Sequence, residues 1–292
     1  MAITLPKIFL DSGDPEETKK VRSLLGFVDG QTTNPSLIAK NPEVQKLIAS
    51  GKRLTEKDLL GYYHEIIQEI SRLIPGPVSA EVYADWETPA SQLLKQAEEM
   101  TTWGRNIYVK FPVIPEGLKA AHEFVLTGGK VNMTLVFDQI QAGAVYSAVR
   151  EAKFPSFVSP FIGRWDDRGI NGLDLVKNIL RQYKGLNREL KRPSQVEVLA
   201  ASIRTLDHFY ACIFMGADIL TVPLKILTEW IHDEQWIPDE HYRVATPGLR
   251  ILPYQHVPFR PDYTQYLIEN VPDSLLSQGL EKFISDWKKL TA

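Results

Sequence analysis

Short apolar runs of β-type composition alternate with longer stretches of helical periodicity along nearly all of the 292 residues. In eight places the apolar run passes directly into polar, glycine or proline residues. The expected strands begin at Lys7, Phe27, Val78, Asn106, Lys130, Ser156, Glu197 and Ala217. The pattern therefore predicts eight consecutive strand–helix units.

The stretches between the expected strands have helical periodicity, and prolines or acidic residues open several of them. We expect helices over 15–25, a long pair across 35–73, and helices over 89–100, 115–126 and 138–152. Gly128 and Gly129 follow one of these helices, so we interpret them as a helix C-cap and not as a phosphate cradle.

This alternation favours a parallel sheet, and eight repeats favour a single α/β domain over residues 1–292, a (β/α)8 (TIM) barrel with additional helices. The alternative is an open, doubly wound sheet. Neither GxGxxG nor GxxxxGK[ST] occurs, which argues against a dinucleotide or P-loop site. In a barrel, chemistry is located at the carboxyl ends of the strands.

Charge and composition narrow the choice of partners. Thirty-three basic and 36 acidic residues give a net charge of -3, which argues against nucleic acid and against a polybasic membrane patch. No run of about 18 apolar residues and no targeting segment is evident, so we expect a cytoplasmic protein. The single cysteine, Cys212, has apolar neighbours typical of a buried helix position.

The expected strand ends are unusually polar, and their shared position is what points to a site. They carry Asp11, Thr33, Asn34, Glu81, Lys110, Asn132, Thr134, Ser159, Arg164, Ser202 and Arg204. Asn34, Asn132, Thr134 and Ser159 have short donor and acceptor groups suited to sugar hydroxyls, although each could equally satisfy loop backbone.

Lys110 is the most informative of these residues because it directly follows apolar strand residues. Desolvation favours a neutral amine, which can attack a carbonyl and form an imine. The alternative is a lysine that extends to the barrel mouth or pairs with Glu81. Imine chemistry needs two acids, and Asp11 and Glu81 are the candidates. Asp11 could instead cap the helix that begins near Pro15, and Glu81 could be only a counter-ion.

Two arginines near the expected sixth and seventh strand ends suggest a phosphate site. Arg164 and Arg204 lie close to serines, and the planar guanidinium matches phosphate oxygens. The alternative is an ion pair with Asp166 or Asp167. None of the six histidines falls at an expected strand end, which argues against the histidine-ligated zinc of a metal-dependent aldolase.

Sequence blocks in this order resemble the transaldolase family, including its fructose-6-phosphate aldolase-like members. The resemblance runs from Phe9 to Leu290. It is carried by FLDSGD, DGQTTNPSLIAK, SAEV, YVKFP, EGLKA, NMTLVF, VSPFIGR, LAASIR and GADILTVPLKIL, of which TTNPS and SPFIGR are the most specific.

The resemblance implies a role for each block. Lys110 of YVKFP would form the Schiff base, and Asp11 would take the proton of the substrate hydroxyl as the carbon–carbon bond breaks. Glu81 would shuttle protons through a water held by Thr134. The remaining roles would be substrate binding: Asn34, Asn132 and Ser159 around the dihydroxyacetone fragment, Arg164, Ser202 and Arg204 at the phosphate, and Thr33 and Phe161 as further substrate-binding residues.

The implied reaction moves a dihydroxyacetone unit from sedoheptulose 7-phosphate or fructose 6-phosphate to an aldose phosphate, as in the pentose phosphate pathway. No metal and no organic cofactor is implied, because the protonated imine is the electron sink. We expect sugar phosphates as ligands, no nucleic acid or membrane partner, and a homo-oligomer.

Three alternatives remain open. A fructose-6-phosphate aldolase, which releases free dihydroxyacetone, typically has glutamine in place of Glu81 and tyrosine in place of Phe161, so both residues favour transaldolase. A Schiff-base aldolase for a sulfonated or otherwise modified sugar is the second. A barrel that binds sugar phosphates without catalysis is the third.

Two stretches depart from the compact family pattern, 165–194 and 232–273. The second combines six prolines with interleaved aromatic residues just before the last expected helix. We predict an extended strap that packs on the barrel. The alternatives for its role are a surface cover, or a lid or oligomer contact that alters acceptor preference.

Overall fold

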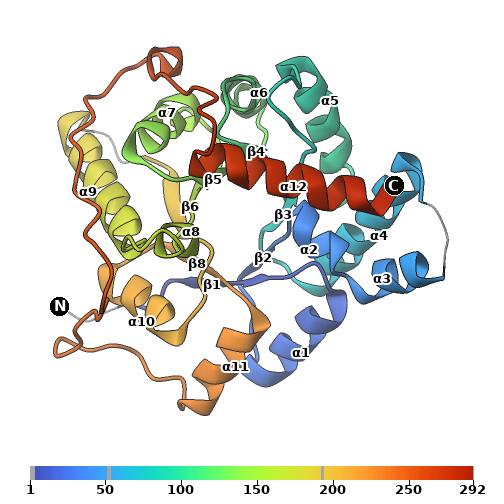
Figure 1. Cartoon of the computed structure of the whole chain (residues 1–292), viewed down its shortest axis with the longest axis horizontal. Coiled ribbons are helices and arrows are strands. Elements are labelled where there is room, and N and C mark those ends of the chain that lie inside the picture. Colours follow the sequence, from blue (N-terminus) through green and yellow to red (C-terminus); the bar gives the residue numbers. More distant parts are fainter. Residues whose placement is uncertain (1–3, 51–53, 192–193, 292) are drawn as a thin grey trace.

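The eight expected strands form a closed, all-parallel barrel in sequence order (Figure 1). The structure is a computed structural model that describes residues 4–50, 54–191 and 194–291. The strands are β1 (Lys7–Asp11), β2 (Gly30–Thr32), β3 (Val78–Glu81), β4 (Ile107–Pro112), β5 (Val131–Val136), β6 (Ser156–Pro160), β7 (Val196–Ala200) and β8 (Ile219–Val222). The predicted barrel is confirmed, and the open-sheet alternative is wrong.

Helices surround the barrel, and their starts follow the sequence signals. They are α1 (Pro15–Leu25), α2 (Pro35–Ala39), α3 (Pro42–Ala49), α4 (Glu56–Leu73), α5 (Ala90–Thr101), α6 (Pro115–Leu126), α7 (Gln139–Val149), α8 (Gly163–Asp166), α9 (Leu173–Glu189), α10 (Leu206–Met215), α11 (Leu224–His232) and α12 (Leu275–Thr291).

The expected long pair across 35–73 is in fact three helices, so that prediction is wrong in number. Asn41 caps α3 through its side chain, and Pro42 occupies the first helical position, which ends α2 after five residues. Thr55 then opens α4 with a capping box. Gly128 adopts a φ of +90° after α6, which confirms the C-cap interpretation.

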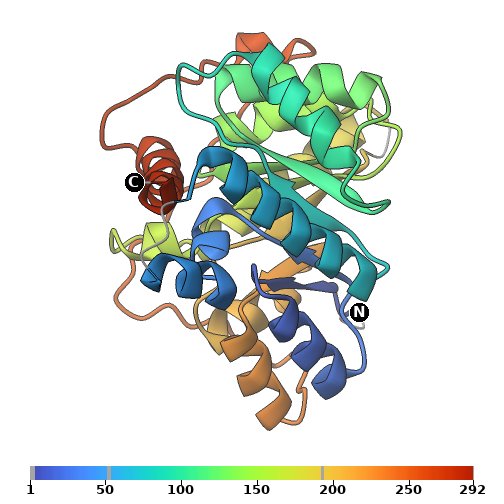
Figure 2. The ribbon, with the colours of Figure 1, turned by 90° about the vertical axis from the view of Figure 1, so that its right-hand side faces the viewer.

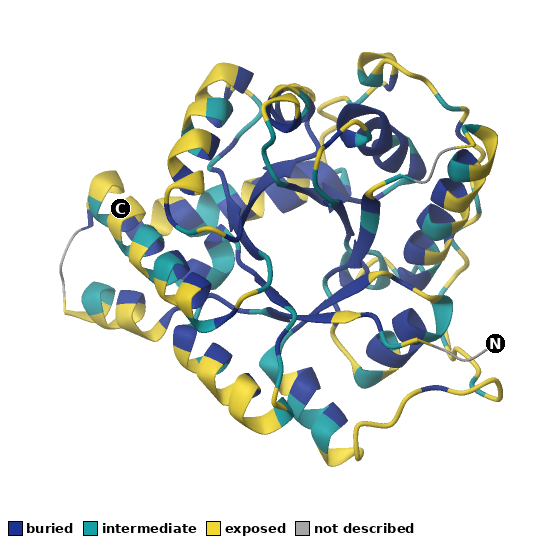
Figure 3. Ribbon diagram, turned by 180° about the vertical axis from the view of Figure 1, so that it is seen from behind, coloured by how far each residue is buried: buried dark blue, intermediate teal, exposed yellow. Residues whose placement is uncertain are grey.

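An apolar plug fills the lower part of the barrel interior and sets the depth of the site. Its members are Phe9, Tyr108, Phe157, Leu199, Ala201 and Ile219. The Tyr108 and Phe157 rings stack with centroids 4.5 Å apart. Because strand side chains alternate between faces, residues two positions further along β1, β4 and β6 also point inward. Asp11, Lys110 and Ser159 therefore form the next layer, toward the carboxyl ends of the strands. Most of the ring of strands is buried (Figure 3).

The predicted strap connects α11 to α12 and contains only one short 3-10 helix, η1 (Tyr263–Gln265), among the described residues. It is tied to the barrel helices by hydrogen bonds, for example from Asn178 Nδ2 to the Leu252 carbonyl and from Ser147 Oγ to the Arg260 carbonyl. Tyr266 of the strap is buried against α7, where Gly143 leaves room for its ring. The strap therefore packs on the barrel, as predicted.

The strap leads into α12, which lies across the mouth of the barrel. Figures 1 and 2 show α12 lying over the carboxyl ends of the strands, beside α2. Gly279 allows this approach, since a Cβ there would lie 2.9 Å from a methyl carbon of Leu135. Among the described residues, no helix is both long enough and apolar enough to cross a membrane. Cys212 is buried in α10, as predicted.

Candidate active site

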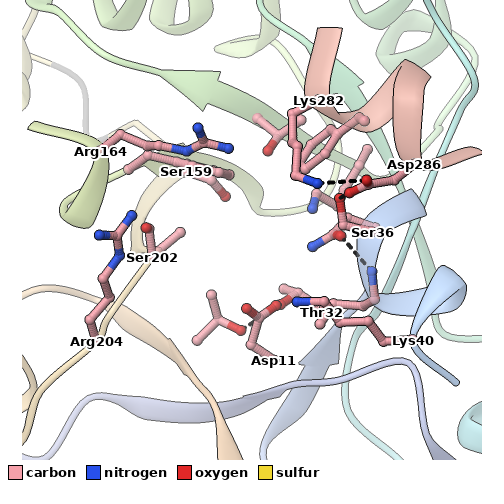
Figure 4. Close-up of a pocket in the computed structure, with 18 residues that line it drawn as sticks. Asp11, Thr32, Ser36, Lys40, Ser159, Arg164, Ser202, Arg204, Lys282 and Asp286 are labelled. Atoms are coloured by element: carbon pink, nitrogen blue, oxygen red, sulfur yellow. Dashed lines mark hydrogen bonds and ion pairs between the residues drawn. The ribbon is translucent and has the colours of Figure 1, made fainter. Parts of the chain in front are cut away.

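A cavity of about 280 Å³ lies at the carboxyl ends of the strands, under α12 (Figure 4). It is lined by Asp11, Thr32, Asn34, Ser36, Leu37, Lys40, Lys110, Thr134, Ser159, Phe161, Arg164, Ala201, Ser202, Arg204, Thr221, Lys282, Phe283 and Asp286. Nine of the predicted site residues are in this lining. Three others, Thr33, Glu81 and Asn132, are buried in the strand layer around Lys110.

Lys110 and Glu81 form a buried ion pair on neighbouring strands. The register of β3 and β4 aligns the two residues, and Lys110 Nζ lies 3.0 Å from Glu81 Oε2. Nζ also donates a hydrogen bond of 2.9 Å to the Thr33 carbonyl. Lys110 and Glu81 are only 4% and 3% exposed, so Lys110 does not extend to the mouth. Burial raises the pKa of the Glu81 carboxyl, although the Lys110 charge opposes the shift.

Asp11 lies at the end of β1 and faces the cavity. Its Oδ1 accepts a 2.7 Å hydrogen bond from Thr32 Oγ1. Burial raises the pKa of the Asp11 carboxyl above its ordinary value, against the opposing charge of Lys110. The capping alternative for Asp11 is wrong: Asp14 caps α1, and its side chain accepts from the Glu16 amide.

A chain of buried amide and hydroxyl groups continues from Lys110 along β5 and β6. Asn132 is the register partner of Lys110, its Nδ2 donates to Ser79 Oγ, and its Oδ1 accepts from Ser159 Oγ at 2.7 Å. Thr134 lines the cavity, and its buried Oγ1 has no hydrogen-bond partner among the described protein atoms. A buried hydroxyl without a partner is costly in an ordinary core, so this group is suited to binding a ligand or a water.

The side chains of Thr33 and Asn34 both form hydrogen bonds with backbone groups. Thr33 Oγ1 donates to the Ser79 carbonyl within the wall of the barrel, and only its backbone oxygen reaches Lys110. Asn34 caps α2, since its Oδ1 accepts from the Leu37 amide at 2.9 Å. Asn34 nevertheless lines the cavity, where its amide nitrogen can still donate.

The arginine end of the cavity is built by α8 and the loop after β7. Arg164, Ser202 and Arg204 all line it, and Ser202 holds a left-handed backbone with a φ of +58°. Arg204 Nη1 and Nη2 donate to Asp167 at 2.5 and 2.8 Å. Arg204 therefore forms an ion pair with Asp167, which was the alternative to phosphate binding. Hydrogen bonds from Arg204 lower the pKa of Asp167. Gly163 leaves room for this position of Arg204, because a Cβ there would lie 2.1 Å from Arg204 Nε.

Several residues of the cavity were not predicted from the sequence. Ser36, Leu37 and Lys40 directly follow TTNP, so the motif itself was the available signal. Lys282, Phe283 and Asp286 come from α12, and their position depends on the path of the strap. Phe161, which was predicted, lines the cavity and packs edge-to-face on Phe137.

Comparison with known proteins identifies relatives of this chain. The family model described as "Transaldolase/Fructose-6-phosphate aldolase" matches residues 8–292. A protein of Leptospira biflexa named "Probable transaldolase" is 39% identical over 219 residues, which are 75% of this chain and 87% of that protein. Proteins of the same name from Brucella ovis and Bdellovibrio bacteriovorus are 39% and 36% identical, over 74% and 77% of this chain and 85% and 90% of theirs. The chain belongs to the transaldolase/fructose-6-phosphate aldolase family.

Proposed function

We propose that the protein is a transaldolase that transfers a dihydroxyacetone unit between sugar phosphates through a Schiff base on Lys110. The observation that carries the proposal is the buried pair of Lys110 and Glu81, which lies beside Asp11 at the floor of one cavity. A buried amine next to a carboxylate that can accept its proton is the arrangement that a carbonyl nucleophile needs.

The reaction begins with addition of Lys110 Nζ to the ketose carbonyl. Glu81 takes the proton that the ammonium must lose, and loss of the carbonyl oxygen as water leaves a protonated imine. Thr134, with its unpartnered buried hydroxyl, is placed to hold the water that carries these protons. The pKa of Glu81, which burial raises above its ordinary value, makes this carboxylate a better proton acceptor.

Asp11 performs the second proton transfer. The Asp11 carboxylate takes the proton of the C4 hydroxyl as the C3–C4 bond breaks. The electron pair of that bond moves into the imine and gives an enamine. The aldose phosphate leaves. The enamine then attacks the aldehyde carbon of the acceptor, and Asp11 returns its proton to the new hydroxyl. Hydrolysis of the imine restores Lys110.

Two groups of residues are suited to bind different parts of the substrate. Asn34 and Ser159 offer amide and hydroxyl groups to the dihydroxyacetone fragment, and Asn132 holds Ser159 in place through a hydrogen bond. Arg164, Ser202 and Arg204 offer charged and hydroxyl donors to a phosphate at the other end of the cavity. The separation of these two sets supports a ketose phosphate as donor and an aldose phosphate as acceptor.

Two residues favour transfer over simple aldol cleavage. Fructose-6-phosphate aldolases typically have glutamine and tyrosine where this chain has Glu81 and Phe161. The phenyl ring of Phe161 cannot donate a proton to the enamine, so the enamine persists until an aldehyde arrives. The cytoplasmic location, the pathway and the homo-oligomer stay predictions.

Acceptor dependence tests the proposal. Fructose 6-phosphate should be consumed only when erythrose 4-phosphate is present, with formation of sedoheptulose 7-phosphate. A Lys110→Met variant should lose at least about 10³-fold in kcat because the covalent route is removed. Rapid release of free dihydroxyacetone without acceptor would favour the aldolase instead, and unchanged turnover in the Lys110 variant would refute the mechanism.

A further inference from the structure

The helix α12 contributes a cation to the cavity. Lys282, Phe283 and Asp286 lie on one face of α12 and line the cavity from the side opposite to the arginines (Figure 4). Lys282 Nζ donates to Asp286 Oδ1 at 2.6 Å. Its side chain is still 50% exposed, whereas that of Asp286 is only 12% exposed. The ion pair is therefore open to solvent on the lysine side only.

Asp286 has other partners besides Lys282. Its second oxygen accepts a hydrogen bond from Ser36 of α2, and Lys289 Nζ lies 3.7 Å from Oδ1. Together these donors lower the pKa of Asp286, against the effect of burial. If Lys282 leaves, Asp286 keeps a hydrogen bond and a nearby positive charge. Because half-exposed ion pairs contribute little free energy, this departure costs little.

Two other cations of the cavity are already paired. Lys110 pairs with Glu81, and Arg204 pairs with Asp167. Lys40 lines the cavity on the side of Asp11 (Figure 4). A phosphate dianion at the arginine end therefore meets Arg164 and a guanidinium whose charge is already balanced. A further cation in the cavity would strengthen the binding of this dianion.

We propose that Lys282 is a phosphate-binding residue: its ammonium leaves Asp286 and extends across the cavity toward the phosphate of the bound sugar at the arginine end, which couples α12 to the loaded site. The inference rests on the proposed function for the identity of the ligand. The four-carbon stem of lysine gives the ammonium the reach for this exchange. Ser36 and Lys289 hold Asp286 and the helix in place meanwhile.

Phosphate binding by variants of α12 tests the proposal, with inorganic phosphate and fructose 6-phosphate as the probes in calorimetry. Lys282→Met keeps the stem and removes the charge. Lys289→Met is the matched control, because it removes the same charge from the same helix outside the cavity. The Kd for both probes should rise about tenfold in Lys282→Met relative to Lys289→Met, as expected for one lost charge-assisted contact.

Asp286→Asn should lower the Kd for phosphate, whereas Lys282→Met should raise it. It frees Lys282 while the amide oxygen can still accept from Ser36, so phosphate should bind more tightly than to the unmodified protein. This gain should vanish when Lys282→Met is also present. Weaker binding in both single variants would show a merely structural pair and overturn the proposal, as would equal Kd values for Lys282→Met and Lys289→Met.

Kinetics separate this inference from the proposed function. The ratio of the KM for fructose 6-phosphate to the KM for unphosphorylated fructose should rise about tenfold in Lys282→Met, because only the phosphorylated sugar uses the contact. A Lys282-dependent phosphate site in a protein that transfers no dihydroxyacetone would overturn the proposed function and leave this inference intact. An unchanged KM ratio would overturn the inference and leave the transaldolase proposal intact.

Discussion

Replacing Gly163 by alanine tests the proposed phosphate site at the arginine end of the cavity. Gly163 opens α8, and an added Cβ would lie 2.1, 2.6 and 2.7 Å from Nε, Cδ and Cζ of Arg204. Ordinary carbon contacts require about 3.5 Å or more, so the guanidinium must move by at least about 1.4 Å. The substitution therefore displaces Arg204 without changing its charge.

The expected loss follows from the contacts that depend on this position. The bonds of 2.5 and 2.8 Å from Arg204 to Asp167 would stretch past hydrogen-bond range or swing the guanidinium out of the cavity. Loss of one charge-assisted contact to the phosphate costs about 1.5–3 kcal/mol. The Kd for fructose 6-phosphate should therefore rise roughly 10- to 150-fold.

Calorimetry on Gly163→Ala, Arg204→Ala and a glycine control measures this effect. Gly185→Ala is the matched control, because Gly185 lies inside α9 with no atom within 4 Å of the added Cβ. It should leave the Kd unchanged and raise the unfolding free energy by about 0.5–1 kcal/mol. Wild-type affinity in Gly163→Ala would refute the assigned geometry, and wild-type affinity in Arg204→Ala would remove Arg204 from the phosphate site.

Three further substitutions test the roles proposed for Asp11, Thr134 and Phe161. Asp11→Asn should raise the free energy of unfolding at pH 7: the raised pKa of Asp11 means that its ionisation opposes folding, so the gain disappears below about pH 4 in denaturant titrations. A gain that persists at pH 3 would contradict this account. Thr134→Val should keep the fold but slow imine formation by about 10²- to 10³-fold in single-turnover kinetics, and a wild-type rate would count against the Thr134 water. Phe161→Tyr should increase release of free dihydroxyacetone without acceptor, which product analysis would detect, and no increase would remove Phe161 as the determinant.

The fold could be predicted because its signals are local. Each parallel strand is buried on both faces and reads as a short apolar run, and each polar strand end marks where β turns into α. The wrong number of helices expected across 35–73 has a local cause too. The helical periodicity continues through Asn41 and Pro42, but these two residues end one helix and begin the next.

The site was predicted only where strand ends define it. Asp11, Lys110 and Ser159 follow from the period of two above an apolar plug, and β-strand register brings Glu81 beside Lys110. The cap function of Asn34 was one of two open alternatives, and geometry was needed to show that the residue both caps α2 and lines the cavity. No periodicity could place Lys282, since it reaches the cavity over a strap of about 40 residues without regular pairing to the barrel.

Trapping of the covalent intermediate tests the central claim most directly. Borohydride added with fructose 6-phosphate should reduce the imine and leave a stable mass increase on the peptide that contains Lys110, and Lys110→Met should show none. The burial of Lys110 beside Glu81 makes this lysine the expected and specific target. An adduct on another lysine, or none with any ketose phosphate, would contradict the account.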